Sequence, residues 1–192
     1  MPWETSISSL SLSKTQIADT ASERTPVGGT GAQGSAIVKH LSSTNEYKIL
    51  ALTRSTTSDA AQEIADFPNV ELIESAASFG YDVDAFYKAA QRSDYALINT
   101  DGFALGEQAE TYWGIRLFEL SARAGVKHLI WSGLDYNGRK SGFDPSLYVG
   151  HYEGKARVTG LWLRRWSTFI VTDVIRRVDA VATYQPHGLD SD

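Results

Sequence analysis

Three glycines near the start of the chain have the spacing of a loop that holds phosphate groups. Gly29, Gly31 and Gly34 fit the pattern G-x-G-x-x-G, and Gly28, Gly31 and Gly34 also fit G-x-x-G-x-x-G. In such a loop one glycine allows a tight turn, one lets the backbone approach a pyrophosphate, and one packs a helix against a strand. The amides that open the next helix then face the phosphates, where the helix dipole favours anions. This spacing predicts a dinucleotide site, with a plain glycine-rich turn as the alternative. The site's expected residues are Gly28, Gly29, Thr30, Gly31, Ala32, Gln33 and Gly34.

Two other segments carry polar residues where a predicted strand meets a loop. Arg54 ends the segment ILALTR, which follows the helix after the glycine loop. A site for NAD usually has an acid at this place, whereas an arginine suits the additional phosphate of NADP. Asn99, Thr100 and Asp101 lie where the strand-like YALINT meets the loop DGFALG, at the edge where open α/β sheets bind ligands. The simpler alternatives are a solvated arginine and an Asp101–Gly102 turn.

Short apolar runs alternate with helical segments along the middle of the chain. The expected strands are 47–53, 69–75, 95–100 and 126–133, and the expected helices are 35–41, 57–67, 82–91, 107–125 and 151–166. Segment 168–178 fits a strand or a helix. Repeated strand–helix alternation indicates βαβ units, right-handed crossovers and a parallel sheet. The predicted fold is therefore α/β, a Rossmann-like doubly wound sheet.

The two ends of the chain do not follow this alternation. Residues 1–26 are rich in Ser and Thr and are predicted to form a disordered leader, with 7–12 as an alternative strand. Glu, Arg and Pro in the segment SERTP are unfavourable in a central parallel strand, so the first strand of the sheet is not expected there. An open strand position would expose apolar surface and unpaired backbone, which predicts marginal stability. The domain is expected over 27–183, followed by a loose tail at 184–192.

Composition limits the other functions that the chain could have. The net charge of −5 does not favour nucleic acid as a partner. The chain has no cysteine, which excludes thiol catalysis and cysteine-ligated zinc, and its four histidines lack metal-ligand spacing. No apolar run reaches the roughly 18 residues of a membrane helix. Without a signal-peptide core the expected location is the cytoplasm, with the nucleus as a further option.

Several of these segments together resemble one known family. VGGTGAQGSAIVKHL, LTR, YALINTDGF and HYEGK are similar to the NmrA-like proteins, which are atypical short-chain dehydrogenase/reductases, and to a fungal branch of that family. The similarity covers residues 27 to about 160. It implies NADP(H) bound on a Rossmann fold, with a smaller C-terminal part that closes a cleft. It also implies cofactor contacts from the glycine loop, Arg54, Asn99 to Asp101, and Lys155.

The resemblance leaves the catalytic residues open. Other members of the superfamily place Tyr-x-x-x-Lys on one helix, which puts a phenol and an amine on one face. Here the corresponding residues are His151 and Lys155, and Ser132 follows the strand LIW. His151 can exchange protons near neutral pH, although a histidine at a helix start is often a cap or a surface residue. The role implied for Lys155 is to hold the nicotinamide ribose rather than to act as a base.

The chain also departs from the family pattern. Members often have Gly-Asp after the third strand, where the acid meets the adenine, whereas this chain has Ser75-Ala76. The similarity fades after about residue 158, so most of the substrate-closing part is expected to be missing.

Two functions therefore remain open. The first is an NADP(H)-binding, redox-sensing regulator that contacts a protein partner or a second copy of the chain. The second is an NADP-dependent oxidoreductase for a small carbonyl or enone.

Overall fold

A single parallel sheet organises the part of the chain that the structure describes. The computed structural model describes residues 22–27, 29–165, 170–173 and 182–183, and side chains from 29 to 162. The strands are β1 (Ser22–Val27), β2 (Tyr47–Thr53), β3 (Val70–Glu74), β4 (Tyr95–Ile98), β5 (His128–Trp131), β6 (Ile170–Asp173) and β7 (Ala182–Thr183). They lie in the order β3-β2-β1-β4-β5-β6-β7, and β7 alone among them pairs antiparallel. This order confirms the predicted Rossmann-like, doubly wound α/β fold.

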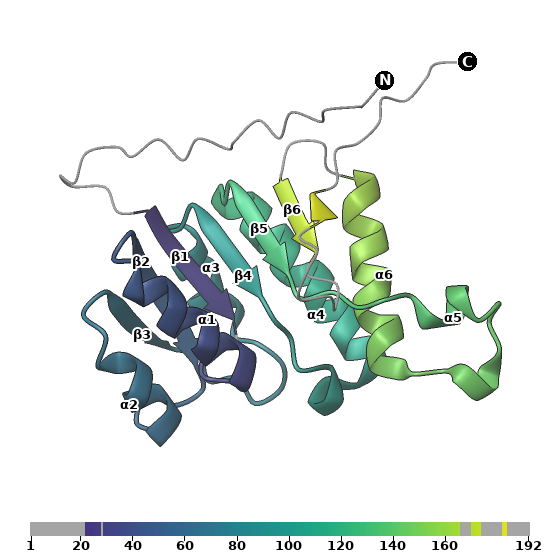
Figure 1. Ribbon diagram of the computed structural model, residues 1–192, viewed down its shortest axis with the longest axis horizontal. Helices are drawn as coiled ribbons and strands as arrows, with labels where there is room; N and C mark the ends of the chain where they lie inside the picture. Colours follow the sequence, from purple (N-terminus) through teal and green to yellow (C-terminus); the bar gives the residue numbers. More distant parts are fainter. Residues whose placement is uncertain (1–21, 28, 166–169, 174–181, 184–192) are drawn as a thin grey trace, which may run out of the picture.

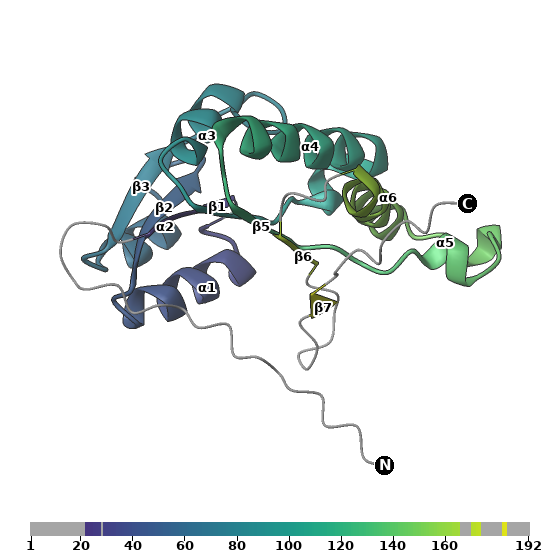
Figure 2. The same ribbon diagram turned by 90° about the horizontal axis from the view of Figure 1, so that it is seen from above.

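The helices form a layer on each face of this sheet (Figures 1 and 2). One layer contains α1 (Ala32–Ser43) and α2 (Asp59–Ala65). The other contains α3 (Val83–Ala90), α4 (Gly102–Ala124) and α6 (Gly150–Arg165). The chain runs from β1 to β3 in one direction and from β4 to β6 in the other, so right-handed crossovers place the two sets on opposite faces. The β5–α6 connection carries the short α5 (Asn137–Lys140) and η1 (Pro145–Leu147).

The centre of the sheet is occupied by β1, which the sequence did not lead us to expect. Whereas a leader is predicted up to residue 26, the structure places Ser22–Val27 between β2 and β4. Arg24 pairs with Ile49 on one side, and Pro26 pairs with Leu97 on the other. Two neighbouring strands offer unpaired backbone groups, and this tertiary context outweighs the poor strand propensity of SERTP. The reason for expecting an open sheet centre is thereby removed. The alternative strand at 7–12 and the tail at 184–192 lie outside the described residues.

Apolar side chains on the two faces of β2 belong to two separate cores. Leu50 and Leu52 pack in the core that contains Phe86 of α3 and Leu117 of α4. Ile49 and Ala51 pack with Val38 of α1 and Ile64 of α2. A strand that is apolar on both faces is typical of a parallel sheet covered by helices.

The helix ends match local sequence signals. Ser58 caps α2 by accepting from the amide of Ala61, and Asp82 caps α3. Gly125 adopts φ 87°, so the predicted C-cap of α4 is confirmed. This helix begins five residues before the predicted start of 107, with a break at Gly106, where φ is 75°. The segment that fitted either a strand or a helix contains β6.

The inner aromatic residues fix α6 against the rest of the molecule. Trp162 is 2% exposed and its ring stacks on Phe118 of α4 with 4.4 Å between the centroids. Trp131 at the end of β5 is completely buried, 5.0 Å from the Trp162 ring. Among the described residues no helix has the length and hydrophobicity needed to cross a bilayer.

Candidate functional site

Parallel register brings the predicted site segments to one edge of the sheet. Val27 pairs with Ile98, and Ile98 pairs with Trp131, so β1, β4 and β5 end at the same level. The glycine loop, the segment from Asn99 and the segment from Ser132 therefore all begin at the carboxyl edge. Ligands of open α/β sheets bind at this edge, beside the point where the chain direction reverses between β1 and β4.

The glycine loop packs closely against β2 and leads into a helix that no side chain caps. A Cβ added to Gly29 would lie 3.1 Å from the Cβ of Ala51 on β2, so the loop backbone closely approaches the strand. Gly31 is the N-cap of α1 with extended backbone, and no side chain caps the helix. The first amides of the helix therefore have no side-chain acceptor and are available to an anion. Gly34 is buried on α1, as the helix-packing position of the motif requires. Gly28 lies outside the described residues.

The loop is also joined to the end of β2, where Arg54 lies. The hydroxyl of Thr30 is 3.4 Å from that of Thr53, the last residue of β2. Arg54 follows directly and is exposed. Within residues 29–162, no hydrogen bond or ion pair of Arg54 is found. The guanidinium is therefore available at the position where an additional phosphate would meet the site. Ala32 and Gln33 are exposed on the first turn of α1.

The segment after β4 shows three different environments. Asn99 is half-buried, Thr100 is 3% exposed, and Asp101 is exposed. Asp101 caps α4, because its carboxylate accepts from the amide of Ala104 at 3.2 Å. The amide of Asp101 donates to the phenolic oxygen of Tyr81 at 3.0 Å. The segment lies at the sheet edge, as expected, but Asp101 and Gly102 begin α4 rather than form an isolated turn.

Tyr81 is a neighbour of this segment that the sequence patterns did not indicate. Burial is the main cause that raises the pKa of Tyr81 to about 12, and the carboxylates of Glu110 and Asp101 act in the same direction. The Asp101 amide and Arg54 oppose this increase. The phenol therefore stays protonated at neutral pH and serves as a hydrogen-bonding group rather than a base.

Lys155 lies in a buried cluster with Thr100 and Glu110. Its Nζ is 2.9 Å from the carbonyl oxygen of Thr100, 3.0 Å from the Thr100 hydroxyl and 2.8 Å from Oε1 of Glu110. The Thr100 hydroxyl donates to the same Glu110 oxygen at 2.6 Å. The ring of Trp131 lies under the ammonium, 4.9 Å from Nζ to the centroid. The structure thus brings together Lys155 and Thr100, which the sequence assigned to one site.

Glu110 was missed, although the helix pattern contains a signal for it. Glu110 shares one face of α4 with Gly114, Leu117 and Ser121, all of which are buried. An acid on the buried face of a long helix needs a partner of opposite charge, so it points to a buried cation nearby. The partner could not be identified without knowing that α6 crosses α4.

The three catalytic candidates are not connected to one another. Ser132 is half-buried and its amide continues the sheet ladder to the Ile98 carbonyl at 3.0 Å. The ring of His151 lies 4.2 Å from that of Phe103, which is 83% exposed. Within residues 29–162, no hydrogen bond joins Ser132, His151 and Lys155 to one another. They do not form an assembled proton-transfer unit in this structure.

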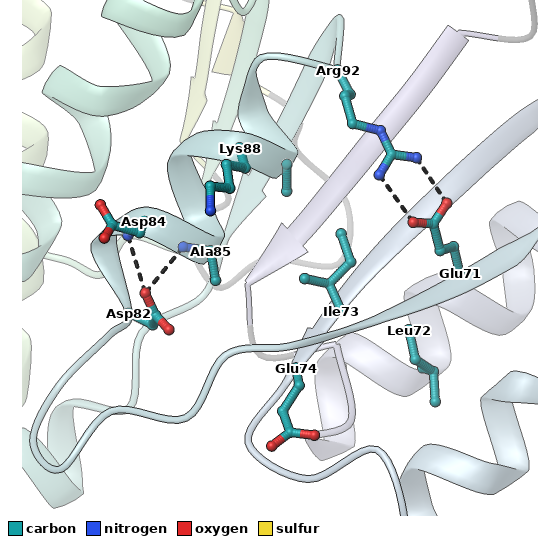
Figure 3. Close-up of a pocket in the computed structure, with 10 residues that line it drawn as sticks. Glu71, Leu72, Ile73, Glu74, Asp82, Asp84, Ala85, Lys88 and Arg92 are labelled. Carbon is teal, nitrogen blue, oxygen red and sulfur yellow. Dashed lines mark hydrogen bonds and ion pairs between the residues drawn. The ribbon is translucent and has the colours of Figure 1, made fainter.

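A hollow of about 520 Å³ lies elsewhere, between β3 and α3 (Figure 3). Two of its charged side chains bind each other, since Arg92 donates two hydrogen bonds to Glu71, at 2.9 and 2.8 Å. A third, Asp82, caps α3. The hydrogen bond from Arg92 is the main cause that lowers the pKa of Glu71. No predicted site residue lines this hollow, and we assign no ligand to it.

Comparison with known proteins extends the match along most of the chain. The sequence profile of the NmrA-like family matches residues 24–178, further in both directions than the resemblance at 27 to about 160. The chain is 29% identical over 119 residues to the NmrA-like family domain-containing oxidoreductase himF of Aspergillus japonicus. That match covers 60% of this chain and 35% of the relative. The chain is also 30% identical over 142 residues to the NmrA-like family domain-containing oxidoreductase malD of Malbranchea aurantiaca, and this match covers 67% of this chain and 41% of the relative. The matched parts of the chain thus cover well under half the length of these curated relatives.

Solved structures share the fold at lower identity. The negative transcriptional regulator NmrA in complex with NADP has a TM-score of 0.65 and 21% identity, covering 81% of this chain and 45% of that one. A short-chain dehydrogenase/reductase from Veillonella parvula in complex with NADP has a TM-score of 0.55 and 14% identity. That match covers 80% of this chain and 67% of that one. At such identities the likeness concerns the fold.

Proposed function

The chain belongs to the NmrA-like family, and from this premise we propose that it binds NADP(H) at the carboxyl edge of its sheet. The observation that carries the proposal is the glycine loop: Gly29 lies against Ala51, and α1 starts without a side-chain cap. The exposed Arg54 beside it gives the preference for NADP(H) over NAD(H). Support for a dinucleotide at this edge also comes from the structural neighbours, since NmrA was crystallised with NADP and with NAD, and the Veillonella parvula protein with NADP.

Most of the predicted residues have a direct role in this proposal. The amides of residues 30–34 bind the pyrophosphate at the start of α1. Arg54 binds the 2′-phosphate, and a guanidinium can donate two parallel hydrogen bonds to it. Asn99 and Asp101 line the edge after β4, and Lys155 lies at the nicotinamide end. The bound cofactor would supply hydride transfer, and the chain's residues would bind and orient it.

We propose a redox-sensing regulator as the function, because Ser132, His151 and Lys155 are not joined into a proton-transfer unit. Such a regulator would pass the redox state of the NADP pool to a protein partner, or to a second copy of this chain. The alternative is an NADP-dependent oxidoreductase for a small carbonyl or enone, which the names of the two fungal relatives favour.

Equilibrium binding of NADPH and NADH to the purified chain tests the proposal. We expect tighter binding of NADPH, and Arg54→Glu should abolish the preference while Arg139→Glu, an exposed arginine on α5, should not. A lost phosphate–guanidinium pair of about 1.5–3 kcal/mol corresponds to roughly 10- to 150-fold in affinity. Equal loss of affinity in both variants, or none in either, would show that Arg54 does not contact the phosphate.

Consumption of NADPH over a panel of carbonyl compounds separates the regulator from the oxidoreductase. Turnover with any of them would establish the enzyme. Tight binding of NADPH with no turnover across the panel is the result expected for the regulator.

A further inference from the structure

All three N–H groups of the Lys155 ammonium are engaged within the protein. The acceptors are the carbonyl oxygen of Thr100, the hydroxyl of Thr100 and Oε1 of Glu110, at 2.9, 3.0 and 2.8 Å. A lysine ammonium has three donors and no acceptor. The side chain is 8% exposed, and that of Glu110 is 0% exposed. A ligand can therefore bind Lys155 only if one of these three bonds is released.

The packing around Glu110 shows that space is kept for this carboxylate. A Cβ on Gly102 would lie 2.9 Å from Oε2 of Glu110, and a Cβ on Gly154 would lie 3.0 Å from its Cγ. Oε2 is buried without a hydrogen-bond partner among the described residues. Larger side chains at either glycine would displace the carboxylate from Lys155. Glycines at both positions thus let α4 and α6 close around the ion pair.

We infer that Glu110 is a positioning residue that holds the charged Lys155 at the end of β4 for the nicotinamide half of the cofactor. This inference rests on the proposed NADP(H) site. The Thr100 hydroxyl is the acceptor that is released, because it remains hydrogen-bonded to Glu110 when the ammonium turns to a ribose hydroxyl. Glu110 and the Thr100 carbonyl keep the ammonium in place during this exchange.

The inference makes opposite predictions for the two partners of Lys155. Glu110→Gln removes the counter-charge of a buried ammonium, and Lys155 is then no longer held at the sheet edge. Thr100→Val removes the bond that the ligand must otherwise displace, while the carbonyl acceptor is retained. The first variant should therefore weaken binding of the nicotinamide half, and the second should strengthen it.

The test compares NADPH with adenosine 2′,5′-bisphosphate, which lacks the nicotinamide half, on the full chain. The quantity measured is the ratio of the two dissociation constants, NADPH over bisphosphate. Loss of the charged partner should raise this ratio roughly tenfold or more in Glu110→Gln, and loss of the competing bond from the ammonium to the Thr100 hydroxyl should lower it by roughly the same factor in Thr100→Val. The control is Glu107→Gln, because Glu107 pairs with Arg157 across the same two helices at a more exposed place.

The outcomes separate the inference from the proposed function. Equal changes for both ligands in Glu110→Gln, or a ratio that moves as much in Glu107→Gln, would reduce Glu110 to a structural ion pair and overturn the inference. If Glu110→Gln does not fold, an unchanged or increased ratio in Thr100→Val overturns it equally. A wild-type chain that binds neither ligand refutes the proposed function itself.

Discussion

The close contact between α4 and α6 gives a sharp test of how the site is held together. Gly114 of α4 faces α6, where an added Cβ would lie 2.6 Å from Cγ2 of Val158 and 3.0 Å from Cη2 of Trp131. By contrast, a Cβ added to Gly160 on α6 would have no atom of the described residues within 4 Å, apart from the adjoining residues of its own helix. Neither glycine adopts positive φ, so alanine is compatible with the helical backbone at both.

Replacing each glycine by alanine isolates the cost of this contact. Both variants gain helix propensity, about 1 kcal/mol each in the free energy of unfolding. Only Gly114→Ala also overpacks the core, which costs typically about 1–3 kcal/mol. Since the propensity gain is shared, the difference between the two variants measures the overpacking. We expect Gly160→Ala to be more stable than wild type, and Gly114→Ala to be less stable than Gly160→Ala by about 1–3 kcal/mol.

Urea unfolding, followed by tryptophan fluorescence, measures both free energies. A second substitution identifies the clashing atoms, because Val158→Ala removes the two methyl groups that the new Cβ meets. Val158→Ala should therefore destabilise the Gly114→Ala protein less than it destabilises wild type. Equal stability of the two alanine variants, or additive effects in the double variant, would refute the close α4–α6 contact.

Two further predictions concern aromatic residues. Trp162→Ala should lower the free energy of unfolding by about 3–5 kcal/mol, because a buried ring stacked on Phe118 is lost. Trp162→Phe should lower it much less, since Nε1 of Trp162 has no hydrogen-bond partner among the described residues that the change would remove. Urea unfolding measures both free energies. The pKa of Tyr81 is about 12 in the folded protein and about 10 in the unfolded chain. The contribution of its neutral phenol to the free energy of unfolding is therefore complete below pH 10 and is lost as the pH rises through 12. Tyr81→Phe should remove this alkaline loss from the pH dependence of stability; an unchanged alkaline limb in the variant would assign the loss to other groups.

The regular part of the fold could be predicted because each element carries its own local signal. The run from Ile49 to Thr53 is buried, as expected of a strand covered on both faces. The C-cap Gly125 directly follows α4 in the sequence, and the N-cap Ser58 directly precedes α2. Signals of this kind depend on neighbours in the chain and not on the tertiary structure.

The first strand could not be predicted for the opposite reason. The segment from Ser22 to Val27 has little strand propensity, and its place is set by β2 and β4, which lie on either side of it. Backbone pairing with two strands at once is available to almost any sequence, and only the assembled sheet supplies it. Sequence patterns therefore fail to predict a central strand when its strand propensity is low and its place is set by the two strands on either side of it.

The candidate site divides along the same line. The glycine loop and Arg54 are adjacent to one strand–helix unit, and their spacing alone was enough to place them at the sheet edge. The position of Lys155 depends on three elements instead: the end of β4 through Thr100, α4 through Glu110, and α6 itself. Their meeting requires the close approach that Gly114 and Gly154 allow. The adenine half of the proposed cofactor should thus tolerate changes in helix packing that the nicotinamide half does not, because a shift of α6 against α4 moves Lys155 and leaves the loop after β1 in place.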